Sequence, residues 1–280
     1  ERYFLEEARF GYDQKTHKIE VGKPIGQFYG YKTSGLYQIE DFDYDAKNQT
    51  YTLKEGVPYM SGTFNRNDVR PGMWKFEDRN GDKIIDDSDM TVIGNANPDF
   101  YGGLNNQFKY KEWDFSLFFT FSYGGEVLNA TKLTNTKTAT TNYSVLDIAN
   151  SSNRWMTVNS EGQPITDPAE MAAINAGKTV ACIYDMEAGD KYIHSWAVED
   201  ASFLRLSNLS LGYTFDRKKL RKFNVQSLRL YFTGSNLFVW TPYSGFDPEV
   251  STKGNNLTPG VDYGAYPRNR SYVFGLNITF

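Results

Sequence analysis

The clearest hydrophobic pattern in the chain lies at residues 113–123, WDFSLFFTFSY. A strand turns alternate side chains to opposite faces, so this spacing predicts a strand with one apolar face and one milder face. The last ten residues, SYVFGLNITF, repeat the pattern up to the final phenylalanine. The two apolar rows consist of Trp113, Phe115, Leu117, Phe119, Phe121 and Tyr123, and of Tyr272, Phe274, Leu276, Ile278 and Phe280.

Three further segments carry the same alternation. Residues 100–110 precede the first strand with only Lys111 and Glu112 between them, which predicts a hairpin. Residues 202–214 and 227–238 predict two more strands. Within 202–214 the apolar row shifts its phase between residues 206 and 209, and this shift predicts a β-bulge.

The connections between these strands are unequal in a regular way. Short connections at 111–112 and 215–226 alternate with long ones at 12–98, 124–200 and 239–270, and the last two of these read as irregular stretches. Outer-membrane barrels have short periplasmic turns and long extracellular loops. The pattern therefore predicts an all-β, antiparallel transmembrane barrel with its apolar rows toward lipid and the three long stretches outside. An antiparallel β-sandwich also has alternating strands and long loops, and it is the alternative from the pattern alone.

Composition narrows the function classes. The 280 residues include 20 Tyr and 20 Phe, and 34 Asp and Glu outnumber 30 Lys and Arg, so nucleic acid is not an expected partner. No apolar run approaches the roughly 20 residues of a membrane helix. The only cysteine, Cys182, excludes an intramolecular disulfide. Residues 1–20 lack the features of a signal peptide, so we expect a cytosolic protein or an internal or processed part of a longer one.

Six blocks, in one order, resemble the SusC/RagA-type TonB-dependent outer-membrane transporters. They cover about 21–280 apart from the stretch 130–200. The blocks are VGKPIGQFYGYKTSGLY (21–37), DRNGDKIIDDSDMTVIGNANPDFYGGLNNQF (78–108), WDFSLFFTFSYGGEVLN (113–129), SFLRLSNLSLGYTF (202–215), LRLYFTGSNLFVWTPYSGFDPEV (228–250) and DYGAYPRNRSYVFGLNITF (262–280).

This resemblance implies a plugged barrel of about 22 strands in the cell outer membrane. Residues 1–280 would be its C-terminal part with about six strands, while the plug, an N-terminal accessory domain and the TonB-contacting box would lie upstream. The whole protein would import an oligomeric nutrient, a glycan or alternatively a peptide, under a SusD-like surface lipoprotein and with energy from TonB. A non-transporting display or adhesin barrel and a soluble carbohydrate-binding β-sandwich remain alternatives.

One segment, DRNGDKIIDDSD at 78–89, has the oxygen-ligand spacing of a calcium loop. Ca²⁺ prefers several oxygen ligands, and this spacing can wrap them around one centre. Lys83 stands where such loops normally have glycine, and a short Asp89 stands where glutamate is usual. An acidic loop whose Asp and Asn side chains only form turns is the alternative. The predicted ligands are Asp78, Asn80, Asp82, the Ile84 carbonyl, Asp86 and Asp89.

Aromatic residues in the long connections are weaker candidates. Trp155, Trp196 and Tyr243 could stack on a sugar ring or a peptide side chain, although loop aromatics equally often pack the loop itself. The two histidines, His17 and His194, lie far apart, and no glycine-rich phosphate loop follows a strand. The sequence therefore predicts no enzyme.

Overall fold

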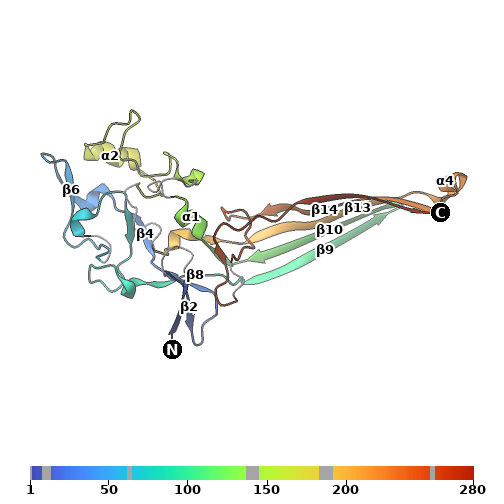
Figure 1. Ribbon diagram of the computed structural model, residues 1–280, viewed down its shortest axis with the longest axis horizontal. Coiled ribbons are helices and arrows are strands. Elements are labelled where there is room, and N and C mark those ends of the chain that lie inside the picture. Colours follow the sequence, from blue (N-terminus) through green and yellow to red (C-terminus); the bar gives the residue numbers. More distant parts are fainter. Residues whose placement is uncertain (1, 8–13, 62–64, 137–144, 183–191, 253–255) are drawn as a thin grey trace. The chain divides into compact units, whose positions relative to one another are not determined.

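The computed structural model describes residues 2–7, 14–61, 65–136, 145–182, 192–252 and 256–280 (Figure 1). The chain divides into two compact units. Unit 1 comprises Glu1–Ala96, Leu128–Val198 and Thr252–Gly264. Unit 2 comprises Asn97–Val127, Glu199–Ser251 and Ala265–Phe280.

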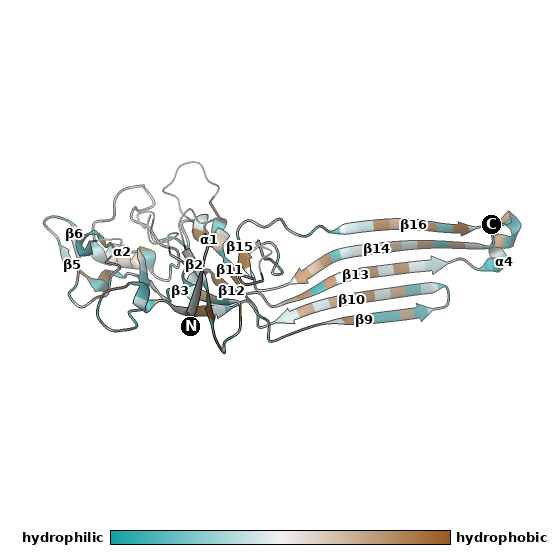
Figure 2. Cartoon of the chain, turned by 60° about the horizontal axis from the view of Figure 1, so that its bottom comes forward, coloured by the Kyte–Doolittle hydropathy of each residue, from teal (hydrophilic) through white to brown (hydrophobic). Residues whose placement is uncertain are grey.

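Unit 2 contains a long antiparallel sheet of five strands, which lie side by side in Figure 2. All five fall in segments whose alternation predicts strands, so the all-β, antiparallel expectation is confirmed. Tyr110 pairs with Trp113, which confirms the hairpin with Lys111 and Glu112 in its turn. In sheet order the strands are β16 (Ser271–Thr279), β14 (Ser227–Trp240), β13 (Phe203–Thr214), β10 (Trp113–Tyr123) and β9 (Phe100–Tyr110).

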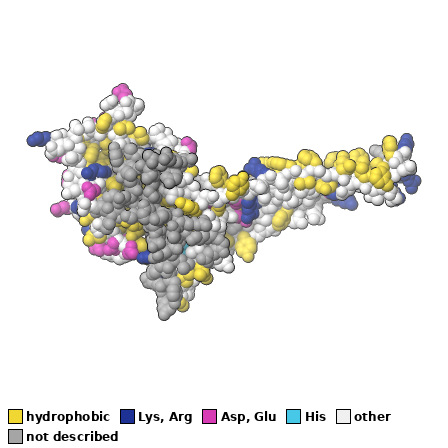
Figure 3. Space-filling model, viewed as in Figure 1, with side chains coloured by type: hydrophobic (Ala, Val, Ile, Leu, Met, Phe, Trp, Pro, Cys, Tyr) yellow, Lys and Arg dark blue, Asp and Glu magenta, His cyan; other side chains and the backbone are white. Residues whose placement is uncertain are grey.

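The register of this sheet keeps the apolar rows on one face. Directly paired residues of antiparallel strands share a face, and Leu117 pairs with Leu209, as Phe232 pairs with Phe274. Figure 2 shows hydrophobic and hydrophilic residues alternating along the strands. Many side chains of the apolar rows are exposed, and Phe274 is 81% exposed. In Figure 3, hydrophobic side chains run along the part of the molecule that this sheet forms.

The predicted bulge in β13 is confirmed. Phe118 pairs with Asn208 and Phe119 pairs with Leu206, so Ser207 is the extra residue. The Ser207 hydroxyl lies 2.6 Å from the Thr120 hydroxyl across the strand pair. Because the bulge inserts one extra residue, the apolar side chains on both sides of it point to the same face of the sheet. This explains why the phase of the sequence pattern shifts there.

Unit 1 is more ordered than the sequence pattern indicated. The prediction that 124–200 and 239–270 are irregular was wrong, because both stretches contain regular elements. One sheet has the order β1 (Arg2–Glu7), β2 (Gln14–Glu20), β3 (Gln27–Gly30) and β8 (Thr91–Asn95). Two strand pairs are β4 (Thr33–Leu36) with β7 (Trp74–Phe76) and β5 (Phe42–Asp45) with β6 (Thr50–Leu53). A three-stranded sheet has the order β12 (Val198–Asp200), β11 (Glu126–Asn129) and β15 (Val261–Asp262).

The remaining elements are short. They are helices α1 (Ala130–Thr134), α2 (Pro168–Asn175) and α4 (Arg217–Leu220), and 3₁₀ helices at Ile39–Asp41, Arg66–Asp68, Asp87–Asp89, Asp147–Ala149, Ser195–Ala197 and Arg221–Phe223. Within the described ranges, no helix has the length and apolar character needed to cross a membrane.

Two hydrophobic cores explain why unit 1 folds rather than remaining loop. Trp74, Phe76 and Trp155 are buried in the first core, and Phe28 and Leu128 are buried in the second. These residues come from segments that are distant in sequence and have no alternating pattern. Their packing stabilises short strands that would be marginal alone.

Candidate functional site

The face of the unit 2 sheet opposite the apolar rows is polar. Arg229 on β14 donates to Asp114 on β10, with Nη2 2.6 Å from Oδ2 and Nε 3.3 Å from Oδ1. These side chains occupy the space beside Gly212 of β13, where a Cβ would meet both of them. A second polar contact joins the hydroxyls of Ser210 and Thr233 at 3.4 Å. The sheet therefore separates an apolar surface from a hydrogen-bonding one.

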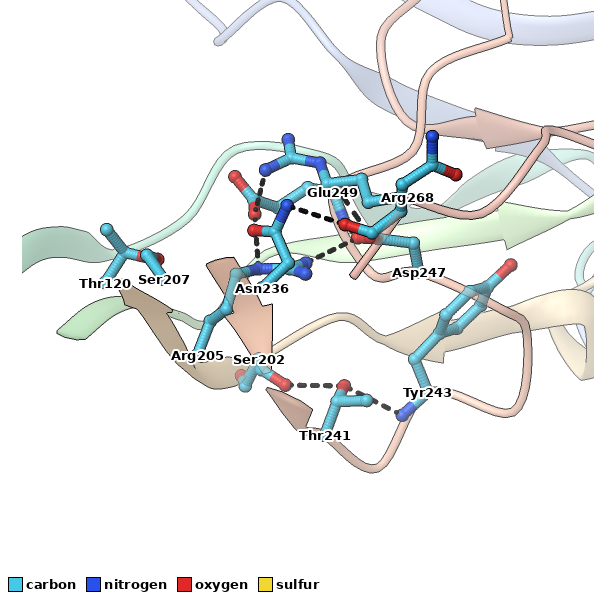
Figure 4. Close-up of polar contacts among 11 residues, drawn as sticks. Thr120, Ser202, Arg205, Ser207, Asn236, Thr241, Tyr243, Asp247, Glu249 and Arg268 are labelled. Atoms are coloured by element: carbon cyan, nitrogen blue, oxygen red, sulfur yellow. Dashed lines mark hydrogen bonds and ion pairs between the residues drawn. The ribbon is translucent and has the colours of Figure 1, made fainter. Parts of the chain in front are cut away.

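A cluster of four charged residues links the connection 241–250, which follows β14, to this sheet through ion pairs (Figure 4). Arg205 on β13 donates through Nη2 to Oδ1 of Asp247 at 2.7 Å and through Nε to Oε2 of Glu249 at 3.0 Å. Arg268, which precedes β16, lies 3.0 Å from the same Glu249 oxygen through its Nη1. The Arg205 side chain is buried, which makes these charge-assisted bonds stronger than surface pairs.

Local hydrogen bonds shape the connection so that it can reach Arg205. The Thr241 hydroxyl donates to the Ser202 carbonyl at 2.8 Å and accepts from the Tyr243 amide at 3.1 Å. Asp247 Oδ1 also accepts from the amide of Glu249 at 2.9 Å. We name the residues Arg205, Asp247, Glu249 and Arg268 the loop clamp.

The loop clamp was not identified from the sequence. Its charged partners lie 42 and 44 residues from Arg205, and no spacing rule links them. The available signal was an arginine within a strand that is otherwise apolar or small, because a charge in such a strand needs a partner.

The first half of the Asp-rich segment 78–89 is folded by its own side chains. Asp78 accepts from the amides of Gly81 at 2.6 Å and Lys83 at 3.0 Å. Asp82 Oδ1 accepts from the amide of Ile84 at 2.8 Å. Lys83 has φ 70°, the left-handed conformation that glycine adopts at this position of a calcium loop. The backbone thus turns as such a loop does even though glycine is missing.

The second half of this segment is also held by carboxylates. Asp89 is 1% exposed, and it accepts from the amides of Arg79 at 2.7 Å and Asp86 at 3.0 Å. The hydroxyl and amide of Ser88 both donate to Asp86, and these bonds lower the pKa of that carboxyl. Among the described residues, no group of three His, Cys, Asp or Glu side chains has the arrangement of a metal site. Calcium binding by this segment stays a prediction.

Two of the three aromatic candidates are buried in hydrophobic clusters, and the third packs against such clusters. Trp155 is 2% exposed in the first core of unit 1, and Tyr243 is 5% exposed beside Val127 and Ala201 in unit 2. Trp196 is half-buried, with the Lys132 ammonium 4.2 Å from its ring centroid. This burial favours packing roles, and their contact with a ligand stays a prediction.

The comparisons with known proteins agree with the resemblance in the sequence. No protein family model matches the chain. The chain is 35% identical over 272 residues to TonB-dependent receptor P3 of Formosa agariphila, covering 95% of this chain and 23% of that protein. It is 28% identical over 207 residues to TonB-dependent receptor SusC of Bacteroides thetaiotaomicron, covering 73% of this chain and 17% of that protein.

The fold resembles solved structures of the same kind. A structure of the RagAB peptide transporter matches with a TM-score of 0.58 at 18% identity and covers all of this chain and 24% of that one. The RagAB peptide importer in its open-open state matches with a TM-score of 0.58 at 20% identity, again over 24% of its chain. At this identity the likeness concerns the fold.

These matches place the chain among the TonB-dependent receptors. It belongs to their SusC/RagA type, and its long antiparallel sheet is a segment of a β-barrel. The relatives are receptors, in agreement with the prediction of no enzyme. The chain spans about a quarter of the length of the first relatives, 23% and 26%.

Proposed function

We propose that this chain forms wall and outer connections of an outer-membrane importer for an oligomeric nutrient. The observation that carries the proposal is the division of the unit 2 sheet into an apolar face and a polar face, which suits a wall between lipid and an aqueous lumen. Its outermost strands, β9 and β16, are long edges of the kind that usually need another strand beside them. Both features fit a segment of a larger barrel.

The proposed cargo is an oligosaccharide, and an oligopeptide is the second candidate. The glycan assignment rests on family resemblance. The peptide candidate is favoured by the likeness to the RagAB peptide transporter. Both cargoes present many hydrogen-bonding groups, which the polar face of the sheet could accept along the barrel interior.

The proposed partners are a SusD-like surface lipoprotein that closes the barrel from outside and TonB, which would act on parts of the protein beyond this chain. Outer-membrane lipid would surround the apolar face. The connections 12–98, 124–200 and 239–270 would lie outside the cell. Unit 1 and the loop clamp would then form folded structure at the outer surface.

The experiment is uptake by cells whose full receptor is deleted or intact. Fluorescent oligosaccharides and oligopeptides of matched size are supplied, and a monosaccharide small enough for porins is the control. We expect the deletion to abolish uptake of one oligomer class and leave the monosaccharide unchanged. Equal uptake of all probes by both strains would refute the import function.

Loss of TonB separates import from display. An importer stops accumulating its oligomer when TonB is removed, because the energy source is disconnected. A display or adhesin barrel would keep binding its ligand at the surface without TonB. Surface binding that continues with no accumulation in either strain would favour the display barrel.

We also propose calcium as a ligand of the segment 78–89, since its backbone already has the turn geometry of a calcium loop. Asp78, Asn80, Asp82, the Ile84 carbonyl, Asp86 and Asp89 would supply the oxygens. The test is anomalous density near Asp82 in crystals of the intact receptor grown with calcium. An Asp78→Asn variant should lose it, while Asp45→Asn, in another exposed turn, should not. A well-ordered segment without density would remove the proposal.

A further inference from the structure

The two ends of the unit 2 sheet differ in charge, and one of them is basic. At the end where β13 turns into β14, the twelve residues 215–226 contain five Lys or Arg and one Asp. The neighbouring hairpin adds Lys109 and Lys111 at the same end. At the other end, the acidic residues Glu199, Asp200, Asp247 and Glu249 lie with Arg205, Arg268 and Arg270, so that end has nearly balanced charge. This asymmetry is local, because the whole chain has a net charge of only −4.

The connection 215–226 is folded in a way that presents its cations outward. The Asp216 carboxylate accepts from the amide of Lys218 at 2.9 Å and begins helix α4. Leu220 is buried, whereas Phe223 at the end of the following 3₁₀ turn is 75% exposed. Asn224, with φ 57°, ends the turn in the left-handed conformation.

The cations of this end are exposed. We name Lys109, Lys111, Arg217, Lys218, Arg221 and Lys222 the basic collar. In the part of the chain that the structure describes, none of these six side chains takes part in an ion pair. Figure 3 shows Lys and Arg side chains at the tip where Figure 1 labels α4. The collar is thus available to an anionic partner.

Aromatic rings lie next to the basic collar. Trp113 lies 4.8 Å from Tyr213 between ring centroids, and Tyr213 lies 4.9 Å from Phe215. A depression of about 550 Å³ between the hairpin and Phe215 is lined by the cations of Lys109, Lys111 and Arg229, the carboxylates of Glu112, Asp114 and Asp216, and Trp113 and Thr214. The excess positive charge of this end therefore comes from the exposed collar residues around the depression. At a membrane interface, the acyl chains are followed by the phosphate groups of the lipids. The apolar strands, then the aromatic rings and then the cations follow the same order at this end of the sheet.

We propose that the basic collar binds the phosphate groups of anionic phospholipids in the periplasmic leaflet, with the exposed Phe223 ring at the boundary with the acyl chains. The inference rests on the proposed outer-membrane location. It commits to phospholipid because short connections of a barrel face the periplasm. Lys and Arg side chains beside an anionic lipid surface are attracted to it within about a Debye length, so the contact depends on salt.

The experiment uses the full receptor in nanodiscs of phosphatidylcholine. Spin-labelled phosphatidylglycerol and phosphatidylcholine are added separately, and the immobilised fraction of each gives their relative association constant. The collar variant is Arg221→Gln with Lys222→Gln. The matched control is Lys23→Gln with Lys47→Gln, two exposed lysines of unit 1. A further arm supplies lipid A, whose phosphates belong to the outer leaflet.

We expect wild type to prefer phosphatidylglycerol and the collar variant to lose that preference by at least about fivefold, while the control keeps it. Raising salt should weaken the preference of wild type without any substitution. If wild type shows no preference for phosphatidylglycerol over phosphatidylcholine, the proposal is overturned. This result is also expected if the basic collar binds a periplasmic protein instead of lipid. A collar variant that keeps the preference, or loses only binding of lipid A, overturns it too. The assay needs insertion but no transport, so its failure is distinguishable from failure of the import function.

Discussion

Arg205 and Asp247 lie 2.7 Å apart between Nη2 and Oδ1, and their side chains are only 4% and 11% exposed. The pair joins strand β13 to the connection that follows β14. Glu249 and Arg268 complete the loop clamp around it. Arg205 is the most buried of the four, and the two carboxylates share it with Arg268, which lies 3.8 Å from Asp247 and 3.0 Å from Glu249.

The loop clamp predicts a large effect of Arg205→Leu. Removing one member of a buried ion pair costs about 3–5 kcal/mol when the other member is left uncompensated. Arg268, 3.8 Å from Asp247, reduces that cost here. We expect faster hydrogen exchange and proteolysis within residues 241–250 of the intact receptor. Arg229→Leu is the matched control, since its pair with Asp114 is 35% and 40% exposed and such pairs contribute about 1 kcal/mol or less.

A double variant tests whether the effect is electrostatic. Adding Asp247→Asn to Arg205→Leu removes the carboxylate charge that has lost its Arg205 partner. Part of the lost protection of residues 241–250 against hydrogen exchange should therefore return. Identical exchange in the single and double variants would show that Arg205 acts through packing alone.

The direction of the apolar rows gives a second prediction. Leu117 pairs with Leu209 on the apolar face, whereas the neighbouring Ser116 pairs with Ser210 on the polar face. In lipid, Leu117→Arg should destabilise the folded barrel by about 2–4 kcal/mol if it lies near the midplane, while Ser116→Arg should have little effect. Urea titration of the receptor folded into vesicles measures both. Equal stability of the two variants would contradict the proposed lipid-facing side.

The lipid-facing set extends to other residues of the same rows. Phe119 pairs with Leu206, and Phe274 pairs with Phe232, so both share the face of Leu117. Phe119→Arg should behave as Leu117→Arg does. The lipid contacts of the predicted rows remain predictions until such variants are measured.

The strands of unit 2 were predictable because each one carries its own signal. Period-two alternation fixes the face of every residue, and the phase shift in β13 predicted a bulge between residues 206 and 209, where the structure has Ser207 as the extra residue. Unit 1 has no such local signal. Its short strands depend on the packing of distant residues such as Trp74 and Trp155, which a pattern within one segment does not contain.

The candidate sites divide in the same way. The turn geometry of 78–89 follows from Asp and Asn spacing, so the sequence anticipated it. The loop clamp joins charges that only the tertiary fold brings together. The burial of Trp155 and Tyr243 is likewise a tertiary property, and a loop aromatic in sequence gives no sign of it.

Gly72 provides a third prediction, for unit 1. It has φ 85°, and a Cβ at this position would overlap the Trp155 ring. Gly72→Ala therefore combines backbone strain with overpacking that typically costs about 1–3 kcal/mol. Gly162→Ala is the matched control, since Gly162 has φ 77° with nothing within 4 Å of the added atom. Thermal unfolding of both variants isolates the ring contact, and equal losses of stability would show that Trp155 moves aside.

The pKa of Asp86 sets a pH prediction. Bonds from Ser88 lower this pKa in the folded loop, so the carboxylate stabilises the turn above the pKa of the unfolded chain. That contribution is lost as the pH falls through the lower, folded value. Hydrogen exchange of residues 84–90, corrected for intrinsic rates, should rise on the acid side. In Ser88→Ala the rise should begin at higher pH, and an unchanged profile would exclude Asp86 as the titrating group.

The conformation of Lys83 gives the last prediction. Its φ of 70° is unfavourable for a residue with a Cβ by about 1–2 kcal/mol, so Lys83→Gly relieves strain that the loop now carries. Glycine also gives the unfolded chain more conformational entropy than lysine does, and this offsets up to about 1 kcal/mol of the relieved strain. We expect Lys83→Gly to be neutral or stabilising. Asp78→Ala should be destabilising, because it removes the acceptor of two amides. Exchange protection of the Gly81 and residue 83 amides measures both, and a loss of protection in Lys83→Gly would mean that the lysine itself holds the turn.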